Sequence, residues 1–413
     1  MIRSLAAMLA GAAVCAACSM AAAEPWFADA SATHLPAPGT GPRNGMDVQA
    51  ADLDADGDLD LVIPQEFALN RVLLNAGGAR FVEASDQIPP LAPEEIVGPP
   101  RAAAHDSEDV SIADFDGDGR LDLVIVSEDD VRMKRINVHQ YYRGRPGGAW
   151  ERVLGQLPDT EADAVAHADL NGDRRPDLII AGAGQDLLLI NDGKGGFRDE
   201  TPARLPVETM TAQDAEFADL DRDGDLDLVL GLEGGHALWV NDGKGVFRDE
   251  TAARLPDPGN VEARKVVVHD VDKDGDLDLY FAHVGWQGRL PQDRLYLNDG
   301  KGRFTDVTAE RLPEESDTTL DAQFADLDKD GDEDLVTSSS GPVRVLLNDK
   351  GRFRDATLEV LPVQPMGANI ALLVQDLNGD RWPDIYVAQL SRSGSAGPSP
   401  QDWLFLHRGK PKG

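Results

Sequence analysis

Regularly spaced aspartates are the residues of this chain best suited to chemistry. A loop of the form D-x-(D/N)-x-D-x-x-x-D occurs seven times, beginning at positions 52, 114, 169, 219, 270, 326 and 376. Carboxylates that alternate along a tight loop converge on one point, and Ca²⁺ is a hard cation that takes about six to eight oxygen ligands. The spacing therefore predicts a calcium site in each loop.

Five of the loops carry four aspartates each, at their first, third, fifth and ninth positions, with Gly at the sixth position to permit the sharp turn. We expect the carbonyl oxygen of the seventh residue to add a further ligand. The predicted side-chain ligands are Asp52, Asp54, Asp56 and Asp60; Asp114, Asp116, Asp118 and Asp122; Asp219, Asp221, Asp223 and Asp227; Asp270, Asp272, Asp274 and Asp278; and Asp326, Asp328, Asp330 and Asp334.

The third and seventh loops depart from this pattern. Asn stands at their third position, and Arg174 or Arg381 replaces the glycine. The predicted ligands are Asp169, Asn171, Asp173 and Asp177 in the third loop, and Asp376, Asn378, Asp380 and Asp384 in the seventh. Because calcium affinity follows the charge of the ligands, we expect these two loops to bind the metal more weakly.

The loops differ from an EF-hand, whose twelfth residue is a bidentate Glu that precedes a helix. Their twelfth residues include Ile63, Leu230 and Phe281, which lie in apolar runs. The alternative that they are merely polar turns is disfavoured, because converging like charges destabilise a fold without a cation. Seven Ca²⁺ ions, each with two charges, would reduce the formal net charge from −35 to −21. Neutralisation on this scale favours a structural role of the metal over a signalling role.

The loops belong to a longer repeat with a period of 50 to 62 residues. A short apolar run ending in an Asn-Asp-Gly-type turn keeps step with them, followed in most copies by an F-x-D-x-T…L-P phrase. In the fourth copy this predicts strands over residues 214–218, 226–232, 237–240 and 247–251. Four antiparallel strands per period indicate a propeller blade. The predicted fold is therefore all-β, a seven-bladed β-propeller.

The two ends of the repeat region indicate a closed ring. The chain has an F-x-D-x-S…L-P phrase at residues 27–36 with no blade before it, and a third-strand run at 403–406 with no fourth strand after it. We expect the N-terminal strand to complete the last blade, which removes two exposed sheet edges.

The Asp loops and their strand flanks resemble the FG-GAP/VCBS repeats of integrin-like propellers, over nearly the whole of residues 24–413. A single D-x-D-x-D-G would be weak evidence, whereas seven copies in register are specific. The resemblance implies a calcium-binding propeller and supports the ligand positions given above.

Topology sorts the connections between strands into two faces. The Asp loops and the Asn-Asp-Gly turns are predicted on one face, and the irregular segments 85–109, 127–137, 282–294 and 389–402 on the other. Binding residues concentrate in surface loops on rigid scaffolds. The candidate contacts on this second face are Arg101, His105, Arg132, Lys134, Arg135, His283, Trp286 and Arg289.

Some of these candidates have two interpretations. Trp286 suits stacking on a sugar ring, or it covers a neighbouring blade. The acidic run from His105 to Asp109 suits acid–base chemistry, or it is a solvated loop with an incidental His. One aspartate lies five residues before the loop in each of four copies, as Asp47, Asp109, Asp214 and Asp321. These four either ring the mouth of a central channel or, as we favour, accept backbone amides between blades.

The N-terminus predicts export. Arg3, the apolar residues 5–17 and the small residues 21–23 form a signal peptide over residues 1–23, which leaves a single propeller domain over residues 24–413. The alternative is an outer-membrane lipoprotein with its lipid anchor at Cys18. Residues 24–413 contain no cysteine and no apolar run long enough to span a membrane. We therefore expect a secreted or periplasmic protein.

The net charge of −35 disfavours nucleic acid as a partner, because phosphate binding needs basic residues. The sequence has no H-E-x-x-H, G-x-S-x-G or phosphate-binding Gly loop with Lys. We expect a monomeric scaffold that binds an extracellular or periplasmic protein or glycan, with Ca²⁺ mainly structural. The alternatives are a polysaccharide lyase or hydrolase that uses the irregular face, and a purely structural surface component.

Overall fold

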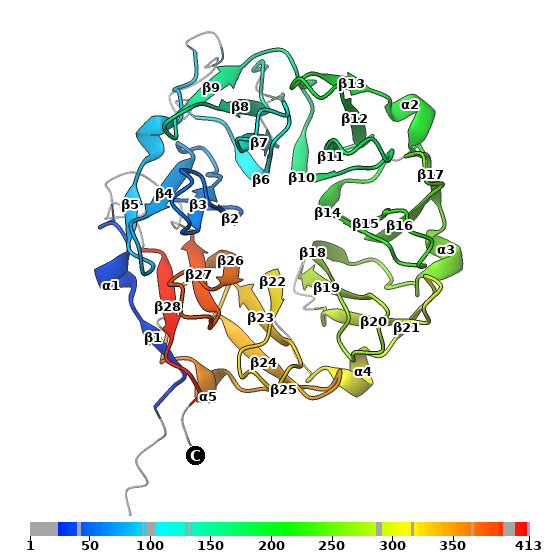
Figure 1. The fold of residues 1–413 in the computed structure, drawn as a ribbon. Helices are drawn as coiled ribbons and strands as arrows, with labels where there is room; N and C mark the ends of the chain where they lie inside the picture. Colours follow the sequence, from blue (N-terminus) through cyan, green and yellow to red (C-terminus); the bar gives the residue numbers. More distant parts are fainter. Residues whose placement is uncertain are drawn as a thin grey trace, which may run out of the picture.

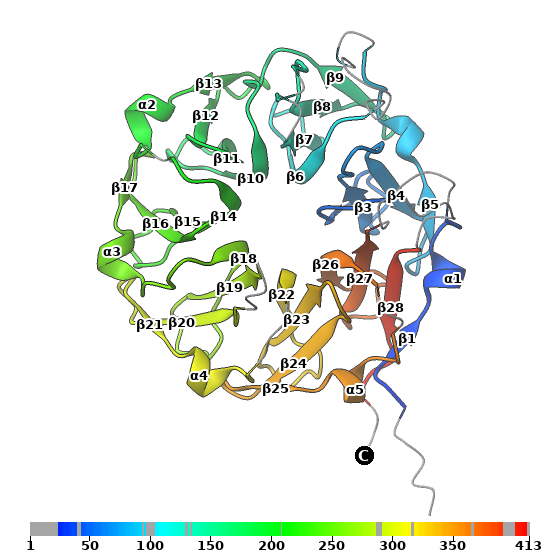
Figure 2. The ribbon, with the colours of Figure 1, turned by 180° about the vertical axis from the view of Figure 1, so that it is seen from behind.

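The computed structural model describes residues 24–38, 43–92, 95, 104–128, 131–132, 134–207, 209–285, 291–314, 318–364, 367–390 and 401–410. Seven four-stranded antiparallel sheets form a ring around a central axis, as Figure 1 and, from behind, Figure 2 show. The seven-bladed β-propeller predicted from the sequence is confirmed. The first strand of each blade lies nearest the centre of the ring, and short helices lie at the outer edge.

The first four blades follow one another along the chain. Blade 1 consists of β2 (Gln49–Ala51), β3 (Asp60–Ile63), β4 (Arg71–Asn75) and β5 (Phe81–Glu83). Blade 2 consists of β6 (Ser107–Ala113), β7 (Asp122–Ser127), β8 (Gln140–Gly144) and β9 (Trp150–Val153). Blade 3 consists of β10 (Ala162–Ala168), β11 (Asp177–Gly182), β12 (Leu187–Asn191) and β13 (Phe197–Asp199). Blade 4 consists of β14 (Ala212–Ala218), β15 (Asp227–Leu232), β16 (Gly235–Asn241) and β17 (Phe247–Asp249).

The remaining blades and the helices complete the ring. Blade 5 consists of β18 (Glu262–His269), β19 (Asp278–Val284), β20 (Arg294–Asn298) and β21 (Phe304–Asp306). Blade 6 consists of β22 (Thr319–Ala325), β23 (Asp334–Ser339), β24 (Arg344–Asn348) and β25 (Phe353–Asp355). Blade 7 consists of β26 (Asn369–Gln375), β27 (Asp384–Gln389), β28 (Trp403–His407) and β1 (Phe27–Asp29). The helices are α1 (Ser31–His34), η1 (Ser85–Gln87), α2 (Thr201–Arg204), α3 (Thr251–Arg254), α4 (Thr308–Arg311) and α5 (Thr357–Val360).

The N-terminal strand closes the ring as the sequence predicts. β1 pairs antiparallel with β28, and Phe27 lies opposite His407. The amide of Leu404 donates to the hydroxyl oxygen of Ser31 over 2.9 Å, which fixes the end of the strand. The edge of the last blade is therefore covered by residues from the other end of the chain.

The hydrophobic core lies between the blades. In the described part of the chain, seven clusters of buried apolar side chains each combine residues of two neighbouring blades. The second strand of each blade, such as β15, is buried along its whole length, apart from the half-buried Val284 at the end of β19, because both of its faces pack against other blades. This explains why these strands read as continuous apolar runs, without alternation.

The predicted fourth strand is wrong at its end. It was expected over residues 247–251, but β17 ends at Asp249 and α3 begins at Thr251. The carboxylate of Asp249 accepts the amide of Thr251 over 2.9 Å, and the Thr251 hydroxyl oxygen accepts the amide of Leu238 over 2.9 Å. The F-x-D-x-T phrase thus turns the chain out of the blade, because its Asp and Thr side chains bind main-chain amides.

Candidate metal centres

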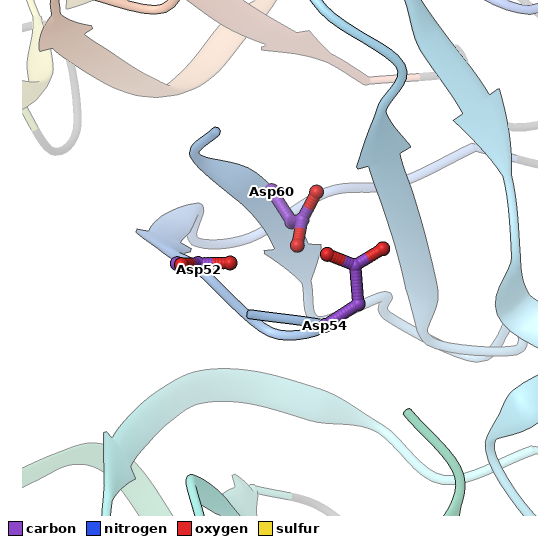
Figure 3. A group of neighbouring side chains, drawn as sticks. All are labelled: Asp52, Asp54 and Asp60. Atoms are coloured by element: carbon purple, nitrogen blue, oxygen red, sulfur yellow. The ribbon is translucent and has the colours of Figure 1, made fainter. Parts of the chain in front are cut away.

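The carboxylates of the first Asp loop converge, as Figure 3 shows for Asp52, Asp54 and Asp60. One oxygen from each of these residues lies within 4.8 Å of the others. The same holds for three groups in other loops: Asp114, Asp116 and Asp122; Asp219, Asp221 and Asp223; and Asp270, Asp272 and Asp278. Neighbouring carboxylates at this separation are suited to share one hard cation.

Two left-handed residues shape each loop. In the first loop, Ala55 has a φ of 65° and Gly57 a φ of 96°, at the fourth and sixth positions. In the third loop the glycine is at the fourth position, as Gly172 with a φ of 78°, and Arg174 adopts a φ of 67° at the sixth. The turn made by Gly57 was predicted, whereas the second left-handed position was not, because Ala, Arg and Lys at that position carry no turn signal.

The amides of the loop point toward its carboxylates. The amides of Asp56 and Gly57 donate to the two carboxylate oxygens of Asp52 over 3.0 and 3.1 Å. The amide of Asp58 donates to Asp56 over 2.9 Å. These bonds hold the side chains of the first and fifth positions in fixed orientations within the loop.

The aspartate at the ninth position has a structural role beside its predicted metal role. Asp60 is buried, and its two oxygens accept the amides of Leu53 and Asn75 over 2.9 and 2.7 Å. Its burial raises the pKa to about 6. The corresponding Asp278 accepts the amides of Val271 and Asn298 over 3.0 and 2.9 Å, and burial raises its pKa to about 7. This residue therefore ties each loop to the third strand of its blade.

Several carboxylate oxygens in the fourth, fifth and sixth loops fit a bound cation. They are buried and have no hydrogen-bond donor among the described residues. These atoms are Oδ1 of Asp219, Asp221, Asp270, Asp272 and Asp326. A buried carboxylate oxygen without a partner is costly, and a cation with oxygen ligands removes that cost. The donor set, all oxygen and mostly anionic, matches the preference of Ca²⁺.

In the third and seventh loops, the side-chain amide of the asparagine at the third position contacts the aspartate at the ninth position. The Asn171 side-chain nitrogen donates to Asp177 over 3.1 Å, and the Asn378 nitrogen donates to Asp384 over 3.4 Å. An ion pair of 2.6 Å between Arg175 and Asp173 adds positive charge to the third loop. Both effects reduce the repulsion that a metal would relieve, although an equivalent pair of Arg120 with Asp118 lies in the second loop. The weaker binding expected in the third and seventh loops stays a prediction.

Asparagines at the ends of third strands join the Asp loops of neighbouring blades. The Asn298 side-chain nitrogen donates to the carbonyl of Leu220 in the fourth loop and to that of Leu277 in its own loop, over 2.8 and 2.9 Å. Asn191, Asn241 and Asn348 make the equivalent pairs of bonds. The Asn-Asp-Gly turns and the Asp loops therefore share one face, as predicted, and we call it the loop face.

Arginines of the outer helices also reach the loop face. Arg254 pairs with the third-position Asp221 over 3.0 Å and donates to the carbonyl of Lys301 in the next blade, also over 3.0 Å. Arg311 lies 3.8 Å from Asp272 in the same relation. These two cations compensate part of the charge of the fourth and fifth loops, and Arg254 also joins the fourth loop to the neighbouring blade.

The irregular segments, on the opposite insertion-bearing face, hold the binding candidates. Arg132 is exposed and pairs with Glu161 over 2.6 Å. His105, Arg135 and His283 are buried, and Arg135 donates to the carbonyl of Ala104 over 2.7 Å. Buried side chains of this kind support the loops and offer little contact surface. Arg101, Trp286 and Arg289 lie outside the described residues.

The His283 side chain forms a pair with His236. Their Nε2 atoms are 2.9 Å apart, and the His236 ring stacks on Phe281 with a centroid separation of 3.6 Å. The His283 Nδ1 atom contacts the carbonyl of Gln292 over 2.9 Å. Sequence reasoning missed this pair, because the two histidines are on different blades.

The aspartates before the loops accept amides between blades, as favoured from the sequence. Asp109 accepts the amide of Val165 over 2.8 Å, and Asp214 and Asp321 accept those of Val266 and Leu372, each over 2.7 Å. Together with Asp47 they also line the channel at the insertion-bearing face. The two interpretations are therefore compatible. Sequence reasoning missed the cations beside them, Arg264 and Lys265.

Comparisons with known proteins agree with this architecture. A family model described as an FG-GAP-like repeat matches residues 169–230, 228–281, 284–337 and 326–387, which together make up more than half of the chain. A search of curated proteins finds no match.

Solved structures of similar shape have low sequence identity. BBS1N in complex with ARL6DN is 13% identical, with a TM-score of 0.57 over 93% of this chain and 98% of that one. The extracellular domain of a protein described as a hybrid two-component system from B. thetaiotaomicron is 12% identical, with a TM-score of 0.51 over 88% of this chain and 40% of that one. An Agrocybe aegerita lectin that specifically recognises non-reducing terminal N-acetylglucosamine is 18% identical, with a TM-score of 0.48 over 76% and 81%. At these identities the likeness to BBS1N and to the extracellular domain shows the fold alone.

Proposed function

The chain belongs to the FG-GAP-like repeat family, and we propose that it is an exported binding propeller, stabilised by Ca²⁺ in its Asp loops, that recognises a protein or glycan through its insertion-bearing face. The observation that carries this proposal is the division of the molecule into two faces. The connections on the loop face are short, repeat from blade to blade and carry converging carboxylates. The opposite face carries the irregular connections, such as those between β7 and β8 and between β19 and β20.

The proposed role of calcium is structural. The loops carry buried carboxylate oxygens without donors, including Oδ1 of Asp219 and Asp270. They are also tied to one another through Asn298 and its equivalents, so a cation in one loop stiffens two blades. A ligand that binds only the folded state stabilises it according to its concentration and affinity.

The proposed export depends on the sequence of residues 1–23, which lie outside the described residues, as does Cys18. In the part of the chain that the structure describes, no helix is long and apolar enough to cross a membrane. A secreted or periplasmic location is consistent with this finding and with calcium at the concentrations found outside cells.

A polysaccharide lyase or hydrolase would need exposed Arg and His side chains on the insertion-bearing face. Three of the candidates, His105, Arg135 and His283, are buried. We therefore propose binding and do not propose catalysis.

Two measurements test the proposal. The melting temperature of the protein, recorded in excess Ca²⁺ and in excess EDTA, should fall by many degrees on chelation and return when Ca²⁺ is restored. A glycan array and a pull-down of surface proteins should give ligands that are lost in an Arg132→Ala variant and kept in a loop-face variant such as Lys244→Ala. An unchanged melting temperature would refute the role of calcium, and ligands lost only in the loop-face variant would refute the assignment of the face.

A further inference from the structure

The channel mouth is the ring of residues where the first strands of the blades begin on the insertion-bearing face. Each of six first strands contains a register shift near this end, for example between Ala263 and Lys265 in β18 and between Ala212 and Asp214 in β14. A β-bulge places an extra residue in one strand and re-aims its side chains. As a result, consecutive residues such as Arg264 and Lys265 both line the mouth.

Acidic side chains outnumber basic ones at the channel mouth. Its charged lining consists of Asp47, Glu108, Asp109, Asp163, Asp214, Asp321, Arg264 and Lys265. Six carboxyl groups therefore face two cations. A buried carboxylate needs a compensating positive charge or a proton, and two cations leave most of the six without one.

The two cations are only loosely paired with these acids. Lys265 Nζ lies 3.2 Å from Asp214 Oδ1, and Arg264 lies 3.4 Å from Glu108 and 3.6 Å from Asp163. Separations beyond about 3 Å are long for a charge-assisted hydrogen bond. The arrangement leaves room for a further positively charged group among the carboxylates.

One carboxylate oxygen at the mouth has no donor in the described structure. Asp163 is only 7% exposed, and its Oδ2 atom is buried without a hydrogen-bond partner. Burial raises the pKa of Asp163 and that of Asp321 to about 7. Asp163 lines the mouth, and its buried carboxylate oxygen without a partner indicates a missing donor.

We propose that the channel mouth binds a primary ammonium group, such as that of a lysine side chain of a partner protein or of a free polyamine. Lys265 already shows how the ring holds one ammonium, between Asp214 and the other acids. The mouth has a volume of ≈ 40 Å³ and continues into a channel cavity of ≈ 280 Å³ lined by Asp109, Asp214 and Glu216. The narrow mouth suits a small cationic head group, and the acids of the wider cavity add negative charge behind it.

An ammonium fits this site better than a divalent metal. The carboxylates come from five different blades, in contrast to the Asp loops, where one short segment supplies all the ligands. Lys265 also repels a divalent ion more strongly than a monovalent one. This inference deepens the proposed function and rests on it only for the choice of face.

Calorimetric titration in excess Ca²⁺ tests the site with three probes: spermidine, N-acetyl-lysine methylamide and, as the uncharged control, N-acetyl-norleucine methylamide. We expect the ammonium probes to bind and the norleucine compound not to bind. Asp47→Asn and Asp163→Asn should each weaken binding about tenfold, because each removes one charge-assisted contact. Asp47 accepts a hydrogen bond from the Gln49 side chain over 3.2 Å, whereas Asp109, Asp214 and Asp321 hold the inter-blade amides. The Asp47→Asn variant therefore keeps those amide bonds.

Glu314→Gln is the matched control, because it removes the same charge from an exposed position away from the mouth. It should leave binding unchanged. Binding of spermidine alone supports a polyamine source, and binding of the lysine compound supports a partner side chain. The proposal is overturned if neither ammonium probe binds, if the norleucine compound binds as well as the lysine compound, or if Glu314→Gln weakens binding as much as Asp47→Asn. A Ca²⁺-dependent melting temperature in the same samples shows that such a failure concerns the mouth and not the proposed calcium scaffold.

Discussion

The side-chain nitrogen of Asn75 donates to the carbonyl of Leu377 over 2.8 Å, and so joins two residues 302 positions apart in the sequence. The same nitrogen donates to Leu59 in its own blade over 3.3 Å. Because Leu377 belongs to the seventh Asp loop and Leu59 to the first, this asparagine bridges the loops on either side of the ring closure. His407 makes the corresponding contact to Leu327, over 2.9 Å, between the sixth and seventh blades.

The first prediction concerns this bridge. Asn75→Ala should lower the free energy of unfolding by about 1–3 kcal/mol, because it leaves the buried carbonyl of Leu377 and the partly buried carbonyl of Leu59 without this donor. Denaturant titration in excess Ca²⁺ measures the change. Asn260→Ala, at an exposed position, is the control and should have little effect. Equal stability of the two variants would show that the bridge does not hold the ring closed.

Blade 2, which has Gly144 at the end of its third strand, shows why the sequence did not predict these hydrogen bonds between blades. Blade 2 has Gly144 where the other blades have Asn or His, and a Cβ atom at this position would lie 2.5 Å from the carbonyl of Leu121. The repeat predicted the strand order, the Asp loops and the ring closure because each depends on local spacing. Which carbonyl an asparagine contacts in the neighbouring blade depends on how two repeats pack against each other. The residue spacing within one repeat gives no information about that packing.

The charged lining of the channel mouth could not be predicted from the sequence for a related reason. A strict alternation of side chains would place Arg264 and Lys265 on opposite faces of β18, and only the register shift at this point brings both to the channel. His283 is a predicted surface contact because it falls in the segment 282–294, which the sequence predicts to be irregular, yet β19 continues to Val284 and buries it. Both errors concern the ends of strands, where the alternation of buried and exposed residues breaks down.

The second prediction concerns the third Asp loop. Asn171→Asp adds a carboxylate and removes the amide bond to Asp177, so it should have opposite effects with and without metal. In excess EDTA the variant should melt at a lower temperature than the wild type, because the added charge faces other carboxylates. In excess Ca²⁺ it should melt at a higher temperature, since a fourth charged ligand strengthens binding. A change of the same sign in both conditions would contradict a metal site in this loop.

The third prediction concerns the left-handed residues of the loops. Gly57 has a φ of 96°, and a Cβ there would meet nothing within 4 Å, so Gly57→Ala should cost about 1 kcal/mol through backbone strain alone. Arg174 adopts a φ of 67°, and Arg174→Gly should relieve a similar strain. Part of this gain is offset by the greater freedom of Gly in the unfolded chain. Thermal unfolding of the two variants side by side should therefore show shifts of opposite sign.

The fourth prediction concerns the pH dependence of stability at the His236–His283 pair. Burial lowers the pKa of both rings, and the charged groups around them are Arg294, Asp293 and Asp306. In the unfolded chain each ring takes up a proton as the pH falls through about 6.5, whereas in the folded chain it stays neutral. The unfolded state then binds more protons, so stability is lost below about pH 6.5, by up to about 1.4 kcal/mol per pH unit for each ring.

A His236→Phe variant keeps an aromatic ring against Phe281 and removes one titrating group. The variant should therefore lose less stability between pH 7 and pH 5 than the wild type. Denaturant titration of both proteins at several pH values gives the two slopes, and their difference cancels the contribution of the Asp loops, which both proteins share. Parallel slopes would mean that the pair is not the acid-sensitive element.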